Sequence, residues 1–133
     1  MNKKKFFIIT WIIVFFFIIL FVFLPIYKIL EINYQALSLY KKAEKAFKLK
    51  SLTEIKNIAT RLEKNYPQSI QQKRILILLL LSYHQASDEF QTKRTYFKIK
   101  EYLKNSKDKI FTKNELKKIE VIAQKYKDSI YGL

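Results

Sequence analysis

An uncharged apolar run near the N-terminus constrains this chain more than any other feature. It reads FFIITWIIVFFFIILFVFL from Phe6 to Leu24, 19 residues in which only Thr10 is polar. As a helix the run is about 28 Å long, enough to cross a hydrocarbon core of about 30 Å. A cleaved signal peptide has a shorter apolar region followed by small residues. Here no alanine precedes Ala36, and the chain has no cysteine for lipid attachment. We therefore predict an uncleaved transmembrane anchor.

Charges beside the run favour one orientation. Three lysines precede it, and on the far side Lys28 is balanced by Glu31. Because lysine and arginine accumulate on cytoplasmic flanks, the N-terminus is expected inside and the rest of the chain outside. The lysine-, isoleucine- and phenylalanine-rich composition is typical of a low-GC bacterium. We thus expect a single-pass protein of the bacterial cytoplasmic (inner) membrane with a periplasmic domain. The expected membrane-interface anchors are Lys3, Lys4, Lys5, Tyr27 and Lys28.

The remainder of the chain is predicted to be all-α. One glycine and two prolines leave almost no hairpin turn chemistry, and apolar residues recur at three- and four-residue steps. The expected helices are 30–49, 52–65, 70–86, 89–105 and 113–130, with the anchor free to continue past Pro25 into the first. The expected domains are a basic cytoplasmic tail (1–5), an anchor (6–24), a juxtamembrane segment (25–33) and a helical domain (34–133).

A second apolar run, Ile75 to Leu81, raises the question of a second membrane crossing. Seven helical residues span only about 10 Å, far less than a bilayer. Charged Arg74 precedes the run and polar His84 follows it. A run that is apolar on all sides and this short is best interpreted as a helix buried in the middle of a small bundle. A buried strand is disfavoured by the flanking helical signals.

Three segments have the capping-box pattern of a helix start, in which a side-chain oxygen accepts from the fourth residue's amide. They are SLTE at 51–54, DEFQ at 88–91 and TKNE at 112–115. In NYPQS, at 65–69, proline ends a helix because the residue before proline avoids the helical region. Short connections of this kind predict antiparallel neighbours.

Two helix pairs align when the chain is shifted by 37 residues. The pattern resembles the tetratricopeptide repeat, which sets large, small and aromatic residues at fixed places in two helices and closes with proline. Matching residues in the two units are Leu39, Ala43, Ala59 and Pro67, and Leu76, Leu79, Tyr83, Tyr96 and Ile99. The units depart from it at Lys42 and Leu80, three extra residues follow Pro67, and neither unit has the usual glycine between its helices. The expected fold is one transmembrane helix followed by a tetratricopeptide-like antiparallel bundle of about five helices, with 113–130 as its cap.

The resemblance implies a concave groove lined by the first helix of each pair. An aromatic and aliphatic floor with a few basic groups suits a partner helix or extended peptide that carries acidic residues. The alternative is that Tyr40, Phe47, Ile77 and Leu81 are core residues covered by the final helix. The implied groove residues are Leu37, Tyr40, Glu44, Phe47, Lys48, Arg74, Ile77, Leu81, His84 and Gln85.

Residues for catalysis are scarce in this sequence. It has no cysteine, one histidine and no glycine-rich loop for phosphate, and no metal-ligand cluster. We therefore expect no enzyme activity, no cofactor and no metal. Asp88 and Glu89 are expected to lie at a helix N-terminus, where their negative charge interacts favourably with the helix dipole. His84 is expected to lie at a helix C-terminus or on the surface.

The sequence after the anchor is strongly basic. From Pro25 onward it carries 23 basic and 11 acidic residues, scattered over every segment. Scattered lysines usually form a solvated surface, while attraction to anionic lipid headgroups is an alternative. Nucleic acid is not an expected partner, because no basic block or aromatic-rich binding motif occurs.

Together these features predict a membrane-anchored protein–protein interaction scaffold of a bacterial envelope or motor assembly. Its partners would be other proteins. Two alternatives stay open: a cytoplasm-facing basic domain that binds anionic lipid, and a homo-oligomeric structural component.

Overall fold

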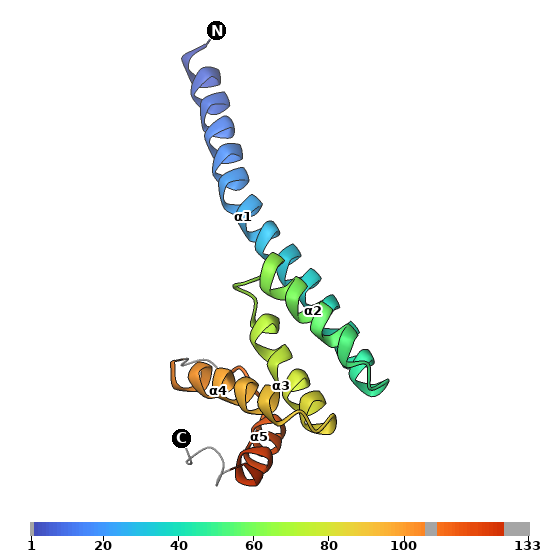
Figure 1. Ribbon diagram of the computed structural model, residues 1–133. Coiled ribbons are helices and arrows are strands. Elements are labelled where there is room, and N and C mark those ends of the chain that lie inside the picture. The colour runs from blue at the N-terminus through green and yellow to red at the C-terminus, as the bar shows by residue number, and fades with distance from the viewer. Residues whose placement is uncertain (1, 106–108, 127–133) are drawn as a thin grey trace. The chain divides into compact units, whose positions relative to one another are not determined.

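The computed structural model describes residues 2–105 and 109–126, which form five helices and no strand (Figure 1). The prediction of an all-α chain is confirmed for this part. The helices closely follow the predicted ranges. The last one ends with Tyr126 as its C-cap, and the predicted continuation to 130 lies outside the described residues. The bounds are α1 Lys3–Lys48, α2 Leu52–Asn65, α3 Ile70–Gln85, α4 Glu89–Asn105 and α5 Lys113–Lys125.

Helix α1 joins the predicted anchor and the first predicted domain helix without a break, with Pro25 inside it. Residues 25–33, expected as a juxtamembrane segment, are therefore helical. By its contacts the chain divides into two units, Met1–Tyr34 and Gln35–Leu133. The second unit thus begins within α1.

The first unit exposes its apolar side chains. Every described residue from 2 to 34 is exposed, and none of the most apolar stretch of α1 is buried. By length and composition α1 is one helix able to cross a membrane, and no second such helix occurs among the described residues. The Thr10 hydroxyl donates to the carbonyl of Phe6 at 2.9 Å. The single polar side chain of the run therefore has a partner within its own helix, as a lipid environment requires.

In the second unit, α3 is the central helix. It contacts α2, α4 and α5, and five of the seven residues in its apolar run are buried: Ile75, Leu76, Ile77, Leu78 and Leu80. Leu79 and Leu81 are half-buried. The prediction that this run is a core helix is confirmed, and its all-round burial explains why it has no polar face.

Helices α1, α2 and α5 each turn one apolar face inward, whereas α4 buries Thr92 and Thr95 with Ile99. Helix α2 buries Ile55, Ile58 and Leu62, and α5 buries Ile119 and Ile122. The part of α1 within this unit buries three alanines, at positions 36, 43 and 46. The Tyr66 hydroxyl at the end of α2 donates to Gln35 Oε1 of α1 at 2.5 Å. This bond links α2 to the segment of α1 beside which it runs antiparallel (Figure 1).

The two turns within the helix pairs have the same backbone geometry. Lys50 between α1 and α2 and Ser87 between α3 and α4 both have φ of 56°. In the first turn the Ser51 amide donates to the Ala46 carbonyl at 2.9 Å. In the second, Asp88 donates to Tyr83 at 3.0 Å. These are Schellman motifs, in which a left-handed residue closes the helix. All corresponding positions are 37 residues apart, the same interval as the sequence repeat.

The predicted helix caps have three different outcomes. Thr112 forms the complete capping box, because its hydroxyl accepts from the Glu115 amide at 3.2 Å and Glu115 Oε2 accepts from the Thr112 amide at 2.6 Å. Asp88 Oδ1 accepts from the Gln91 amide at 3.0 Å. The prediction for Ser51 is wrong: it precedes α2 but makes no side-chain cap bond. At φ −88° and ψ 82° its backbone lies outside the extended conformation typical of an N-cap.

Candidate functional site

A groove runs over the second unit between α1, α3 and α5. Its first hollow, of about 330 Å³, is lined by Tyr40, Glu44, Phe47, Lys48, Ile77, Leu78, Leu81, Glu115 and Lys118. Its second hollow, of about 540 Å³, is lined by Leu81, His84, Asn114, Lys117, Lys118, Val121 and Ile122. Leu81 and Lys118 line both hollows, so the two are neighbouring parts of one surface, which we call the groove.

Seven of the ten predicted groove residues line it. Six line the first hollow, and His84 lines the second together with Leu81. Arg74 lies next to the first hollow, since it contacts both Tyr40 and Glu115 of its lining. Leu37 is half-buried and Gln85 is exposed, and neither lines the two hollows. The residues of the first hollow come from α1, α3 and α5, which lie far apart in the sequence.

Of the four residues that could belong either to the groove or to the core, two are buried in the core and two are half-buried. Tyr40 and Ile77 are only 3% and 2% exposed and belong to the hydrophobic core. Phe47 and Leu81 are half-buried and pack against that core. Tyr40 and Ile77 can therefore offer only an edge to a partner, whereas Phe47 and Leu81 have accessible apolar surface.

Helix α5 contributes a wall of the groove that was not expected from the sequence. Lys117, Lys118 and Val121 lie along it, and Val121 is a large apolar residue left exposed. From the sequence, 113–130 is expected only as the cap of the bundle. The sequence nevertheless contains a sign of this wall. Val121 is an apolar residue that lies outside the apolar face of α5 formed by Leu116, Ile119 and Ile122.

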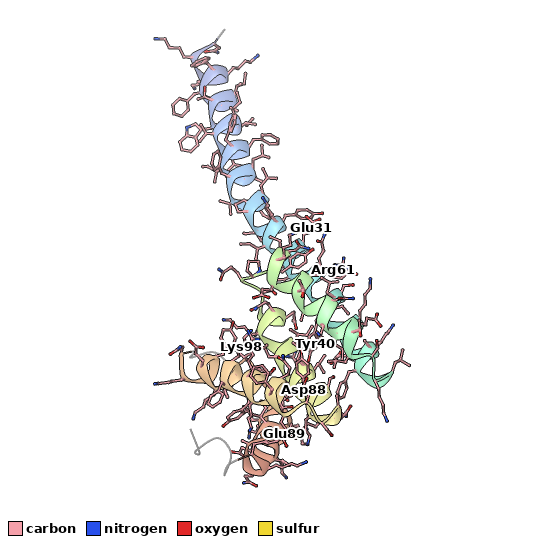
Figure 2. All side chains as sticks on the ribbon, in the orientation of Figure 1. Glu31, Tyr40, Arg61, Asp88, Glu89 and Lys98 are labelled. Carbon is pink, nitrogen blue, oxygen red and sulfur yellow. The ribbon has the colours of Figure 1, made fainter. Side chains whose placement is uncertain are left out.

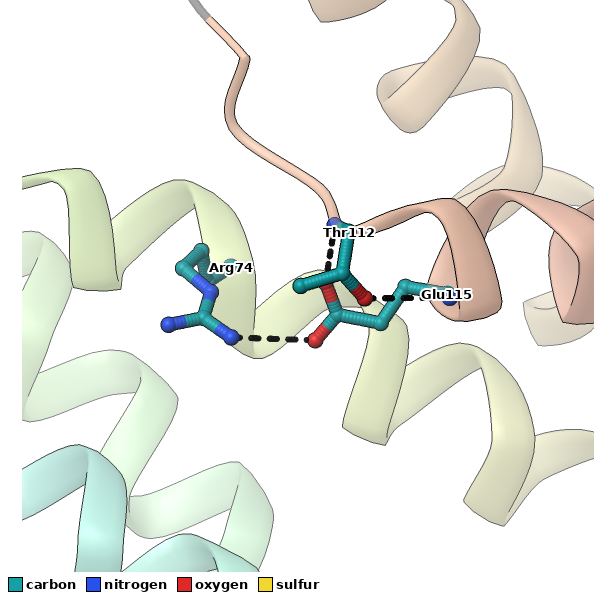
Figure 3. Close-up of polar contacts among 3 residues, drawn as sticks. All are labelled: Arg74, Thr112 and Glu115. Carbon is teal, nitrogen blue, oxygen red and sulfur yellow. Dashed lines mark hydrogen bonds and ion pairs between the residues drawn. The ribbon is translucent and has the colours of Figure 1, made fainter.

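A polar cluster lies at the edge of the first hollow. Arg74 Nη2 donates to Glu115 Oε1 at 3.1 Å, and its guanidinium lies over the Tyr40 ring at 4.9 Å from the centroid. Glu115 uses its other oxygen to accept from the Thr112 amide, so one carboxylate joins α3 to the start of α5 (Figure 3). Arg74 Nε is buried without a hydrogen-bond partner. The Arg74 side chain is therefore held in place, but one of its hydrogen-bond donors is unpaired.

Electrostatics within this cluster change two pKa values. Burial raises the pKa of Tyr40 to about 12, partly offset by Arg74 and reinforced by Glu115 and Glu44. For Arg74, burial lowers the pKa, but the hydrogen bond to Glu115 and the nearby Tyr40 and Glu44 outweigh it and raise the pKa overall. At neutral pH the cluster therefore holds a neutral phenol beside a charged guanidinium.

The far end of the groove contains an aromatic pair. His84 Nδ1 lies 3.2 Å from the Tyr126 hydroxyl, and the two rings meet edge to face with centroids 5.8 Å apart. Lys93 Nζ lies 6.0 Å from the centroid of the same tyrosine ring. The pair connects the end of α3 to the C-cap of α5. His84 is thus a half-buried residue at a helix C-terminus, as the sequence suggested.

The groove combines apolar and basic side chains. Its floor is aliphatic and aromatic, and Lys48, Lys117 and Lys118 stand among its lining. Among the described residues no group of three or more histidine, aspartate or glutamate side chains could hold a metal. The absence of enzyme activity stays a prediction.

Comparison of the chain with known protein families, with curated proteins and with solved structures gives no match. Over residues 2–105 and 109–126 the structure therefore defines an all-helical chain with one helix long and apolar enough to cross a membrane.

Proposed function

We propose that this protein is a membrane-anchored interaction scaffold whose tetratricopeptide-like domain docks an acidic, amphipathic segment of a partner protein in the groove. The observation that carries the proposal is the groove itself, an apolar floor between three helices with lysines among its lining. Such grooves take helices or extended peptides through a few apolar anchors.

The tetratricopeptide-like arrangement is supported by burial as well as by the matched turns. At the 37-residue shift, seven pairs of residues align at the repeat positions of the two units, and six of these pairs have the same burial in both units. Only Lys42 and Leu79 differ, since the lysine is exposed and the leucine half-buried. The matching pairs are Leu39 and Leu76, Ala43 and Leu80, Ala46 and Tyr83, Ile55 and Thr92, Ala59 and Tyr96, and Leu62 and Ile99.

Charge favours an acidic occupant. Glu115 is already paired with Arg74, which leaves Glu44 as the other carboxylate in the lining, against Lys48, Lys117 and Lys118. A partner carboxylate would find these amines at the edge of an apolar surface. Complementary charges of this kind chiefly accelerate association and select the partner, while the apolar contacts supply affinity.

Anchoring would raise the local concentration of the domain at the membrane. The lysines at positions 3–5 favour a cytoplasmic N-terminus and a domain outside the cytoplasm, in the periplasm of a bacterial envelope. A cysteine at exposed Asn105, in a chain that has no native cysteine, tests this orientation. Labelling of intact cells by a membrane-impermeant maleimide is expected, and protection until lysis would place the domain in the cytoplasm.

Site-specific photocrosslinking tests the groove. A photoreactive phenylalanine analogue at Val121, which is exposed in the second hollow, should form an adduct with another protein in the native organism. The same analogue at Thr60, exposed on α2 and lining neither hollow, is the matched control. Lys118→Glu should remove the Val121 adduct while leaving the helix content by circular dichroism unchanged.

The pattern of adducts separates the alternatives. An adduct only with a second copy of the chain would indicate homo-oligomerisation instead of docking of another protein. Equal adducts at Val121 and Thr60, or none at either position, would contradict the proposal that the groove binds a partner. Alanine at Tyr40 is unsuitable for this test, because its buried ring supports the core.

A further inference from the structure

Helix α4 has an apolar feature that the fold does not explain. Phe90 is 71% exposed and Phe97 is 46% exposed. The helix buries Thr92, Thr95 and Ile99, and at 3.6 residues per turn both phenylalanines lie on the side opposite that buried face. They are two turns apart, about 10 Å along the axis. Core packing therefore accounts for neither side chain.

Basic side chains flank the two phenylalanines. At 3.6 residues per turn, exposed Arg94 and Lys104 lie beside them on the outer face. Lys98 and Lys100 lie at the two edges of this face, where they line hollows shared with other helices. The acidic residues of α4 are Glu89 in its first turn and Glu101, which lies one turn from Phe97 on the same face. Figure 2 labels Glu89 at the start of the helix and Lys98 further along it. Exposed aromatic rings within a cationic surface are the composition of helices that lie in the headgroup region of an anionic bilayer.

The same composition fits a protein partner less well. Lysine is depleted in protein–protein interfaces, where arginine and aromatic residues replace it, whereas three of the four cations here are lysines. The chain also carries α1, which is long and apolar enough to cross a membrane. A domain tethered by such a helix stays within reach of headgroups.

We propose that the outer face of α4, with Phe90 and Phe97 at its centre, Arg94 and Lys104 beside them and Lys98 and Lys100 at its edges, binds the surface of an anionic lipid bilayer. The rings enter the headgroup region while the four cations contact lipid phosphates. This face is separate from the groove, whose lining comes from α1, α3 and α5. The proposal holds for either orientation of the anchor.

Tryptophan fluorescence of the full chain in vesicles tests this contact. The chain has one tryptophan, Trp11 in the apolar run, so a Trp11→Phe background is free of indole. Phe90→Trp in that background places a reporter on the proposed face. Leu49→Trp places one at a position that is 77% exposed in the turn after α1. Both are reconstituted into vesicles of phosphatidylcholine alone or with about 30% phosphatidylglycerol, with and without brominated acyl chains.

The Phe90→Trp reporter should shift its emission to shorter wavelength in anionic vesicles, and bromine should quench it about twofold more strongly than in neutral ones. Salt at about 1 M, which shortens the Debye length to roughly 3 Å, should weaken both effects. The double change Lys98→Glu and Lys104→Glu should weaken them too, with unchanged circular dichroism. The Leu49→Trp reporter should respond to neither lipid nor salt.

Three results would overturn the proposal. One is equal quenching in neutral and anionic vesicles. Another is equal quenching of the two reporters, which would mean that the whole domain, rather than this face, approaches lipid. The third is a blue shift without bromine quenching, which would identify a second copy of the chain as the occupant, because the vesicles contain no other protein.

Discussion

Lys50 and Ser87 occupy the same left-handed backbone position, 37 residues apart, and each closes the turn of one helix pair. A left-handed conformation costs a residue with a Cβ about 1–2 kcal/mol, and glycine avoids this cost. The tetratricopeptide repeat usually has a glycine between its two helices. Lys50 and Ser87 occupy the positions where such a glycine would fit best in this chain.

Replacement by glycine should stabilise each turn. Lys50→Gly or Ser87→Gly is expected to raise the free energy of unfolding by about 0.5–1 kcal/mol, because relief of strain exceeds the added freedom of the unfolded chain. Urea unfolding of the full chain in detergent micelles, followed by circular dichroism at 222 nm, measures the change. Lys50→Ala keeps the Cβ and should give no gain. A loss of stability in both glycine variants would contradict the strain argument.

Two serines at helix starts provide a matched pair. The Ser69 hydroxyl accepts from the Gln72 amide at 3.2 Å at the start of α3, whereas Ser51 makes no side-chain cap bond. Ser69→Ala should lower the free energy of unfolding by about 1 kcal/mol, and Ser51→Ala by less than about 0.5 kcal/mol. The same urea titration compares them. Equal losses would show that the hydroxyl bond at Ser69 is not the stabilising element.

The Arg74–Glu115 ion pair should couple α3 to α5. Its side chains are 25% and 17% exposed, so the expected coupling is modest, about 0.5–1 kcal/mol. A double-mutant cycle with Arg74→Met and Glu115→Gln measures it, and glutamine retains an oxygen that can accept from the Thr112 amide. High salt should reduce the coupling. Additive effects of the two changes would show that the pair contributes nothing beyond its separate side chains.

Alkaline pH should reveal the buried phenol of Tyr40. Below pH 10 the hydroxyl is protonated in both states. Between pH 10 and about 12 the unfolded chain ionises while the folded one keeps the proton, because burial raises the pKa of Tyr40 to about 12. The stability that depends on this group is thus present below pH 10 and is lost as pH rises through 12, at up to about 1 kcal/mol per pH unit.

The Tyr40→Phe variant isolates this effect. It keeps a ring beneath Arg74 but has no hydroxyl to ionise, so its stability should fall less steeply above pH 10 than that of the unchanged chain. Every other titratable group is the same in both proteins. Parallel stability curves between pH 9 and 12 would argue against a raised pKa in the folded state.

Local patterns in the sequence predicted most of the helices. The ends of α2 and α4 agree with the prediction, since Pro67 and the Asp88 cap are local signals that act within a few residues. The capping-box pattern has opposite outcomes at two serines. Ser51 fits the pattern but makes no side-chain cap bond, whereas Ser69, which has the same spacing to Gln72 and was not predicted, makes one. The four-residue pattern does not specify the backbone angles at its first residue.

By itself the sequence determined the membrane-length helix, the apolar core run and the 37-residue interval, because each depends on residues close together in the chain. Only the tertiary structure decided which groove residues are covered. Tyr40 and Ile77 belong to the hydrophobic core, while Phe47 and Leu81 keep accessible surface. Tertiary packing also left Phe90 and Phe97 on the outside of α4. Burial depends on contacts between helices distant in sequence, and helical spacing alone cannot supply those contacts.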